Sequence, residues 1–352
     1  MASPANNAMN RLSACLALIV SAAFISSAGL GEDGSRLAPA APSREDPTWR
    51  IWTPLDSFDQ YGGAALGLDG HIWFADQTGT VLLRFDENGK FTTVSTGSYS
   101  LERMARGPNG SLLATTGYYS TIVRFSPSGQ FTTLTIGQPA NGAITAGPDG
   151  SIWIPEESEV GRILPDGSVR EYPLASGDRL GGGTSVTRQM GGDVWFDAGT
   201  PGYSYYLASM NPETGRITKH FQDSCGAYVW PTVAAPDGRV WAVCKGTFDG
   251  FGSDGGVVRV PWPANLGFAM VGAYDNAVIG PDNAIWIAGQ DVVNGLAISA
   301  AFLRFDLVTH KFHKYAAPDS GYAWDAAFAF DPRGNIWAGT YNGQVQEIIF
   351  HR

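Results

Sequence analysis

The sequence predicts an all-β fold, a seven-bladed β-propeller, because one unit recurs along the chain. In residues 144–156 an apolar run, a tight Pro-Asp-Gly turn and a second apolar run with a Trp follow one another. The Gly of that turn supplies the positive φ that such a turn needs. Successive Trp positions are 40, 40, 42, 46, 45 and 51 residues apart, so the unit occurs seven times. A four-strand unit of this length repeated seven times is typical of a propeller.

The Trp position predicts where the core lies. Large aromatic side chains dominate the cores of such folds, so one Trp per unit indicates packing between blades and not a cofactor site. Leu113 replaces the Trp in the second unit. The seven positions are Trp73, Leu113, Trp153, Trp195, Trp241, Trp286 and Trp337.

The N-terminal region predicts export. Arg11 precedes an apolar run from Leu16 to Ile25, which is too short to cross a bilayer, and small residues follow it. We therefore expect residues 1–28 to be a signal peptide. Residues 29–46, rich in Ala and Pro, are expected to be a flexible linker. The propeller then spans 47–352, in a protein located in the periplasm or outside the cell.

The two ends of the propeller are expected to meet in one blade. The last unit supplies only three strands, and residues 49–53 resemble the missing fourth strand. We expect this N-terminal strand to pair with the C-terminal one and complete the seventh blade, because closing the ring removes exposed sheet edges.

The composition limits the partners. The net charge is −10 and the isoelectric point is near 4.9, which argues against nucleic acid and anionic membranes as partners. We expect a monomer, without a membrane span, that binds a small molecule, a glycan or a peptide at the mouth of the propeller.

Acidic residues are predicted to gather at that mouth, where the first strand of a blade starts and the second ends. Loops on such a face carry function. We assign Glu102 and Glu156 as catalytic candidates. Asp76, Asp275 and Asp325 are candidate ligands of a divalent cation, Mg²⁺ or Ca²⁺, since clustered oxygens suit hard cations. The alternative is that all five are solvated loop carboxylates or strand-end caps.

Four aromatic residues fall in the same loops. They predict a ligand-binding platform for a flat or ring-shaped molecule, and packing at the rim of the mouth is the alternative. The four are Tyr61, Trp230, Tyr274 and Trp324.

Longer segments are expected on one side of the mouth. An Arg recurs in five of the expected third strands, and Arg259 and Arg304 lie farthest from the preceding Trp. This spacing predicts long recognition loops over residues 247–256 and 289–300.

Two cysteines remain after the signal peptide. We expect Cys225 and Cys244 to form a disulfide, because the chain is exported and register places both at the mouth. A free catalytic thiol is the alternative.

None of the five histidines is expected at the mouth. His71 falls in a turn on the opposite face, and the others fall on outer strands or in an outer turn. A His-based acid–base mechanism therefore has no candidate there.

Residues 143–156 and 160–174 resemble the streptogramin B lyase (virginiamycin B lyase) family, and the resemblance extends over about residues 47–352. It implies a seven-bladed propeller. It also implies an enzyme that opens the ring of streptogramin B antibiotics by elimination across the ester C–O bond, with Mg²⁺.

The resemblance further implies a His before the first strand of a blade, and a Glu followed two residues later by a His at the end of a second strand. Gly142, Glu156 and Ser158 occupy the matching positions, so the acid–base His residues are missing. Two functions stay open. One is a metal-dependent lyase or lactone-acting enzyme with Glu156 or Glu102 as base. The other is a non-catalytic binding propeller for a sugar, peptide or protein.

Overall fold

The computed structural model describes most of the chain beyond residue 46. No helix occurs among the described residues, so nothing helical there could cross a membrane. The predicted signal peptide and linker lie outside the described part. The described ranges are 47–54, 61–107, 110–117, 119–126, 128–140, 142–147, 149–180, 184–188, 192–200, 205–220, 232–244, 246–263, 265–269, 277–318, 327–340 and 343–351.

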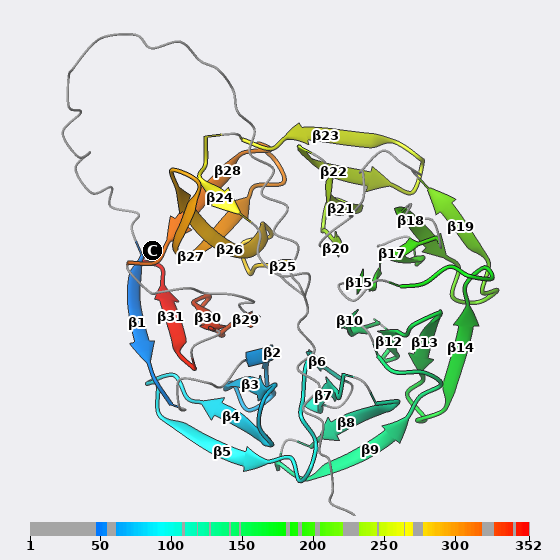
Figure 1. Ribbon diagram of the computed structural model, residues 1–352, viewed down its shortest axis with the longest axis horizontal. Coiled ribbons are helices and arrows are strands. Elements are labelled where there is room, and N and C mark those ends of the chain that lie inside the picture. The colour runs from blue at the N-terminus through cyan, green and yellow to red at the C-terminus, as the bar shows by residue number, and fades with distance from the viewer. Residues whose placement is uncertain are drawn as a thin grey trace, which may run out of the picture. The chain divides into compact units, whose positions relative to one another are not determined.

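Seven antiparallel sheets stand as blades around a common centre, which confirms the predicted propeller (Figure 1). Blade one contains β2 (Tyr61–Leu66), β3 (Ile72–Asp76), β4 (Val81–Phe85) and β5 (Phe91–Ser95). Blade two contains β6 (Met104–Arg106), β7 (Leu112–Thr115), β8 (Thr121–Phe125) and β9 (Phe131–Thr135). Blade three contains β11 (Thr145–Ala146), β12 (Ile152–Pro155), β13 (Glu159–Ile163) and β14 (Val169–Pro173).

The remaining blades follow the same order from the centre outward. Blade four contains β16 (Thr187–Arg188), β17 (Val194–Gly199), β18 (Tyr205–Met210) and β19 (Ile217–His220). Blade five contains β20 (Thr232–Ala234), β21 (Arg239–Cys244), β22 (Thr247–Gly252) and β23 (Val257–Pro261). Blade six contains β24 (Phe268–Ala269), β25 (Ala277–Ile279), β26 (Ile285–Val293), β27 (Leu296–Phe305) and β28 (Phe312–Ala316). Blade seven contains β29 (Ala327–Phe330), β30 (Ile336–Gly339), β31 (Val345–Ile349) and β1 (Thr48–Trp52).

The closure of the ring is as predicted. Strand β1 pairs antiparallel with β31, in a register that runs from Thr48↔Ile349 to Trp52↔Val345. Trp52 also stacks on Trp337, with ring centroids 5.0 Å apart and planes 11° apart. The first and last strands of the propeller therefore share one sheet (Figure 1).

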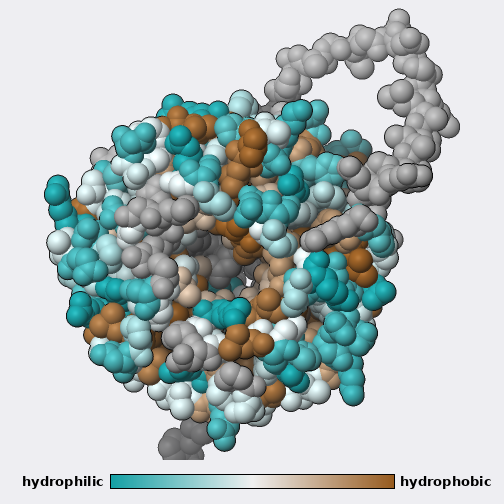
Figure 2. Space-filling model, turned by 180° about the vertical axis from the view of Figure 1, so that it is seen from behind, coloured by the Kyte–Doolittle hydropathy of each residue, from teal (hydrophilic) through white to brown (hydrophobic). Residues whose placement is uncertain are grey.

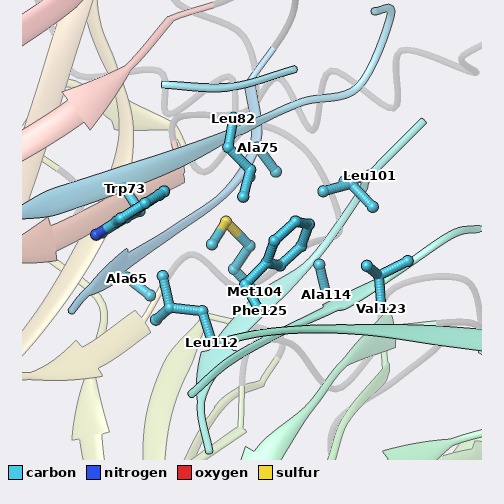
Figure 3. Close-up of a cluster of buried hydrophobic side chains, with 10 residues drawn as sticks. All are labelled: Ala65, Trp73, Ala75, Leu82, Leu101, Met104, Leu112, Ala114, Val123 and Phe125. Carbon is cyan, nitrogen blue, oxygen red and sulfur yellow. The ribbon is translucent and has the colours of Figure 1, made fainter. Parts of the chain in front are cut away.

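The hydrophobic cores lie largely between neighbouring blades. Figure 3 shows the cluster between blades one and two, where Trp73 faces Met104 and Phe125. Four of the blade Trp side chains are at most 2% exposed, which confirms that they pack as core residues. These four are Trp153, Trp195, Trp241 and Trp337.

The Asp of the recurring turn has a second role that explains the recurring Arg. In blade six, Asp282 Oδ1 accepts a hydrogen bond from Trp286 Nε1 at 3.1 Å, and Asp282 Oδ2 accepts one from Arg304 Nε at 2.6 Å. Asp69 makes the same two contacts in blade one. The turn, the core Trp and the third strand are thus joined through one carboxylate.

Loss of that carboxylate should destabilise the fold. In an Asp282→Ala variant the indole N–H loses its acceptor and the Arg304 guanidinium keeps its contact with Asp306 but loses the one with Asp282. We expect a cost of about 1–3 kcal/mol. Urea unfolding measures it. Asp254→Ala is the control, because Asp254 is exposed and, among the described residues, accepts a hydrogen bond from the Gly256 N–H in its own turn. Equal midpoints for the two variants would contradict this role.

The prediction of long loops in blades five and six is wrong. Residues 247–252 form the third strand β22, with Phe248 and Phe251 fully buried, and Arg259 lies in the fourth strand β23. In blade six, residues 289–300 continue β26 and β27 into one long hairpin that turns at Asn294 and Gly295, both with positive φ. These residues form strands because β26 and β27 pair with each other along their whole length, from Ile285↔Phe305 to Val293↔Leu296.

Candidate functional site

The inner strands surround a central hollow (Figure 2). Glu102 lies just before β6, the innermost strand of blade two. Its backbone N–H donates to Thr115 O at 2.9 Å, and its half-buried carboxylate lies against Gly117, where any side chain would overlap it. Arg103, 5% exposed, donates from Nη1 to Gly62 O at 2.6 Å and joins blades one and two.

Asp76 ends β3 and is 3% exposed. Its Oδ1 accepts hydrogen bonds from the Thr78 N–H at 2.9 Å, the Thr78 hydroxyl at 3.0 Å and the Gly79 N–H at 2.8 Å. This is the strand-end cap that was the alternative to metal binding. The role of Asp76 as a metal ligand stays a prediction.

Tyr61 packs between blades one and seven and is 2% exposed. Its hydroxyl donates to Gly343 O at 3.2 Å, and its ring lies 5.4 Å from that of Phe74. This placement fits the alternative of rim packing. The other predicted mouth residues lie outside the described residues: Trp230, Tyr274, Asp275, Trp324 and Asp325.

Cys244 ends β21 and is 5% exposed. Its expected partner Cys225 lies outside the described residues. The pairing of these two cysteines stays a prediction.

The positions that would carry the acid–base histidines have other roles. Gly142, in β10 (Gly142–Ala143), pairs in parallel with Thr184 of β15 (Thr184–Ser185) and links blades three and four. Ser158 donates from its N–H and from its hydroxyl to Gln138 Oε1, at 3.0 Å each. Neither position supplies a group that titrates near neutral pH.

All five histidines are described, and none lies on an inner strand. His71 occupies the β2–β3 turn and His310 the β27–β28 turn. His220 and His313 lie in the outermost strands β19 and β28, and His351 follows β31, the third strand of blade seven. Each histidine side chain contacts a neighbouring residue, so each has a structural role. The neighbours are Asp69 for His71, Ser209 and Trp195 for His220, Phe305 for His310, Tyr315 for His313 and Thr48 for His351.

The structure brings Glu156 together with two carboxylates that the sequence analysis did not select. Glu156 follows β12, Glu159 starts β13 and Glu171 lies in β14. One ligand oxygen from each lies within 4.8 Å of the other two, and no other group of three His, Cys, Asp or Glu side chains this close occurs in the described ranges. Neither Glu102 nor Asp76 belongs to it. We call these three residues the carboxylate cluster.

Strand register explains the carboxylate cluster. Gly161 pairs with Glu171 across β13 and β14, and Glu159 is two residues from Gly161, on the same face. Because Gly161 has no side chain, the Glu156 and Glu171 carboxylates occupy the space beside it: a Cβ there would overlap Glu156 Oε1 and lie 3.1 Å from Glu171 Oε2.

The segment that leaves blade two covers the cluster with two backbone donors. The Gln138 N–H donates to Glu156 Oε2 at 2.5 Å, and the Gly137 N–H donates to Glu171 Oε1 at 3.1 Å. Within the described residues, no Lys or Arg forms an ion pair with any of the three glutamates. The negative charge of the cluster is therefore poorly balanced.

Electrostatics in the cluster favour protonation. Burial raises the pKa of Glu156 to about 8, the nearby Glu171 and Glu159 carboxylates act in the same direction, and the Gln138 N–H opposes them. Burial also raises the pKa of Glu159, with a further contribution from Glu171. Removing a carboxylate from water and placing others beside it both disfavour the charged form.

A cavity of about 410 Å³ lies on the face opposite the mouth, between the turns of blades one and seven. His71, Asp86 and Arg333 are among its lining residues. His71 was predicted on this face from the sequence, and the cavity was not.

The fold and the inner strands define a class of protein: a seven-bladed propeller with a channel mouth. The model of the virginiamycin B lyase family matches residues 59–248, more than half of the chain. The chain belongs to the virginiamycin B lyase family. No curated protein matches it.

Solved structures share the fold at low identity. A streptogramin B lyase structure is 17% identical, with 87% of this chain and 98% of that chain covered and a TM-score of 0.69. A catalytically inactive virginiamycin B lyase variant from Staphylococcus aureus with quinupristin is 18% identical, covering 86% and 99%, with a TM-score of 0.68. The extracellular domain of a hybrid two-component system protein from B. thetaiotaomicron is 14% identical, covering 87% and 43%, with a TM-score of 0.63.

Proposed function

We propose that the protein is an exported binding propeller, which holds a peptide-like or sugar ligand at its mouth without the elimination chemistry of the family's lyases. The placement of the histidines carries this proposal. All five lie in turns or outer parts of the blades, and the matching inner positions are Gly142 and Ser158. Loss of a general acid–base group typically costs 10²–10⁴-fold in rate.

The β26–β27 hairpin supports binding at the mouth. By topology its tip lies on the mouth face, and three apolar side chains are exposed there: Val293 at 46%, Leu296 at 70% and Ile298 at 47%. Asp291 Oδ1, farther down the hairpin, accepts a hydrogen bond from Lys314 Nζ at 2.5 Å. Exposed apolar clusters on soluble proteins mark recognition sites, so the ligand would present apolar groups here.

Two of the compared proteins support the proposal. The Staphylococcus aureus lyase variant was solved with quinupristin, which makes this streptogramin a suitable probe. The two-component system protein uses a domain of similar fold outside the cell, which is compatible with the signal peptide and the Cys225–Cys244 disulfide expected from the sequence.

Quinupristin binding provides the test. We expect it to raise the melting temperature saturably, since a ligand at a hundredfold excess over its Kd stabilises by about 2.7 kcal/mol. A variant with Val293→Asn and Leu296→Asn should bind at least tenfold more weakly. The control is Val308→Asn, at a 90% exposed turn position between β27 and β28. Equal affinity of both variants would contradict binding at the hairpin, and no shift would exclude this ligand class.

A second candidate is a metal-dependent lyase or lactone-acting enzyme. The raised pKa of Glu156, at the family's Glu position, favours it. Here a divalent cation, Mg²⁺ or Ca²⁺, held by Asp76, Asp275 and Asp325 would polarise the ester, and Glu102 or Glu156 would act as base. Conversion of quinupristin to a product would support this candidate over binding alone.

A further inference from the structure

We propose that the cavity between the turns of blades one and seven binds an organic cation, a guanidinium or ammonium group on a short apolar stem. The two blades pack together where the ring closes (Figure 1). The cavity volume of about 410 Å³ falls within the range of about 300–1,000 Å³ that holds small ligands in proteins. Because this face is opposite the mouth, the proposal is independent of any ligand held there.

Three turns and three core side chains form the cavity. Blade one supplies the β2–β3 turn at residues 69–71 and the β4–β5 turn at residues 86–88, and blade seven supplies the β29–β30 turn at residues 331–333. The core side chains that line it are at most 2% exposed: Ile72, Phe85 and Trp337. A ligand would therefore meet polar turns at the surface and an apolar base beneath them.

Arg333 gives the cavity a fixed wall. Its Nη2 donates to Asp331 Oδ2 at 2.7 Å, to Glu347 Oε1 at 2.9 Å and to Glu87 O at 3.2 Å. Asp331 is 7% exposed and Glu347 is fully buried. Two buried carboxylates thus hold the guanidinium of Arg333, and one of its contacts crosses from blade seven to blade one. A wall that is set before the ligand arrives lowers the cost of binding.

The register of blade seven explains why Arg333 is used in this way. In blades one, three and six the third-strand residue that pairs with the core Trp is an Arg. In blade seven, Trp337 pairs with Glu347 instead. The charge at this position is inverted, and Arg333 and Arg50 balance the carboxylates of Asp331 and Glu347.

Two carboxylates of the cavity remain unbalanced. Asp69 in the β2–β3 turn pairs with Arg84, its Oδ2 lying 2.6 Å from Nε. Asp86 and Glu87 form no ion pair with any described Lys, Arg or His. The β4–β5 turn therefore places net negative charge on the cavity. Carboxylates bind guanidinium groups through paired, charge-assisted hydrogen bonds, so this turn would hold the cationic head of the ligand.

The arrangement of the acids favours an organic cation over a metal ion. Among the described residues, only the carboxylate cluster brings three possible ligand atoms within 4.8 Å of one another, and no residue of the cavity belongs to it. Metal ions need oxygens that converge at about 2.0–2.6 Å. A guanidinium on a few methylene groups would instead contact the β4–β5 turn with its head and the apolar base with its stem.

Isothermal titration calorimetry on the full chain tests the proposal with two probes. Agmatine presents the guanidinium on a free small molecule, and N-acetyl-arginine amide presents it as a peptide side chain does. We expect saturable binding at one site per chain, and the tighter probe identifies which of the two sources the cavity takes. N-acetyl-citrulline amide has the shape of the arginine amide without its charge, and it should bind about tenfold more weakly or worse.

A double variant, Asp86→Asn with Glu87→Gln, should weaken binding of the tighter probe by about tenfold or more. Asparagine keeps the side-chain oxygen that accepts two backbone N–H groups in the turn, so the turn is retained. The matched control is Glu213→Gln with Asp254→Asn. Both control residues are exposed, lie in turns between third and fourth strands of other blades, and change the net charge equally.

Circular dichroism checks that each variant is folded. If the double variant is not, Glu87→Gln alone is compared with Glu213→Gln, because both side chains are exposed. The proposal is overturned if neither probe binds saturably, or if the citrulline amide binds as tightly as the arginine amide. Equal affinity of the cavity variant and its control also overturns it, since binding would then reflect only the acidity of the whole protein.

Discussion

Replacement of Trp337 by Ala should lower the free energy of unfolding by about 3–5 kcal/mol, the usual cost of deleting a buried aromatic side chain. Trp337 is 1% exposed, stacks on Trp52 of the N-terminal strand, and lies 5.7 Å from the ring of Phe85 in blade one. Its Nε1 also donates to Asp331 Oδ2 at 3.2 Å. This one side chain contacts the N-terminal strand that closes the ring and the neighbouring blade one.

Chemical denaturation measures the effect of Trp337→Ala, with Val308→Ala as control. Val308 is 90% exposed, and its truncation should change stability little. Trp52→Ala should also destabilise, and the double variant should cost less than the sum of the two, because the stacked rings share one contact. Strict additivity would contradict the role of this stack in closing the ring.

Stability without divalent cations should fall as the pH rises. In EDTA, Glu156 has a folded-state pKa of about 8 against 4.5 when exposed, so between these values the folded state holds a proton that the unfolded state has released. Stability is therefore complete below about pH 4.5 and is lost progressively up to about pH 8. The loss is on the order of 5 kcal/mol at most, at 1.36 kcal/mol per pKa unit, and partial solvent exposure of the cluster lowers it.

The groups facing Glu156 explain the direction of this dependence. Glu159 and Glu171 carry like charge, and the Gln138 N–H is the one donor to its carboxylate among the described contacts. Glu156→Gln cannot ionise, so its stability should vary less over the same pH range. Glu157→Gln should retain the full dependence. The urea unfolding midpoint, measured at several pH values, tests this expectation. If the midpoint of Glu156→Gln changes with pH as much as that of the unaltered protein, Glu156 is not the group responsible.

The fold could be predicted because its determinants are local and repeated. Gly70 and Gly150 have φ of 76° and 77° in the recurring turn, and Asn283 takes the same role in blade six with φ of 57°. Blade five was assigned wrongly because Val257–Val260 has the apolar character of a third strand, while the true third strand β22 is rich in Gly. Composition alone did not separate these two strands.

The candidate site was predicted only in part because register along a strand does not give the direction of a side chain. Glu156 ends its strand as expected, yet its carboxylate lies against Gly161 of β13, with Glu171 of β14 beside it. Glu159 and Glu171 were missed because their proximity depends on the pairing of Gly161 with Glu171. The sequence did contain one indication of this proximity: Glu159, Gly161 and Glu171 lie on one face of a predicted hairpin.

Turnover of quinupristin is the measurement that tests the central claim, binding without elimination, most directly. The protein is incubated with quinupristin and Mg²⁺, with and without EDTA, and the products are separated by liquid chromatography and mass spectrometry, with a streptogramin B lyase as positive control. Elimination gives a ring-opened isomer of unchanged mass at a new retention time, and hydrolysis gives a product one water heavier. We expect intact quinupristin alone. A ring-opened product that depends on Mg²⁺ and on this protein would contradict the account.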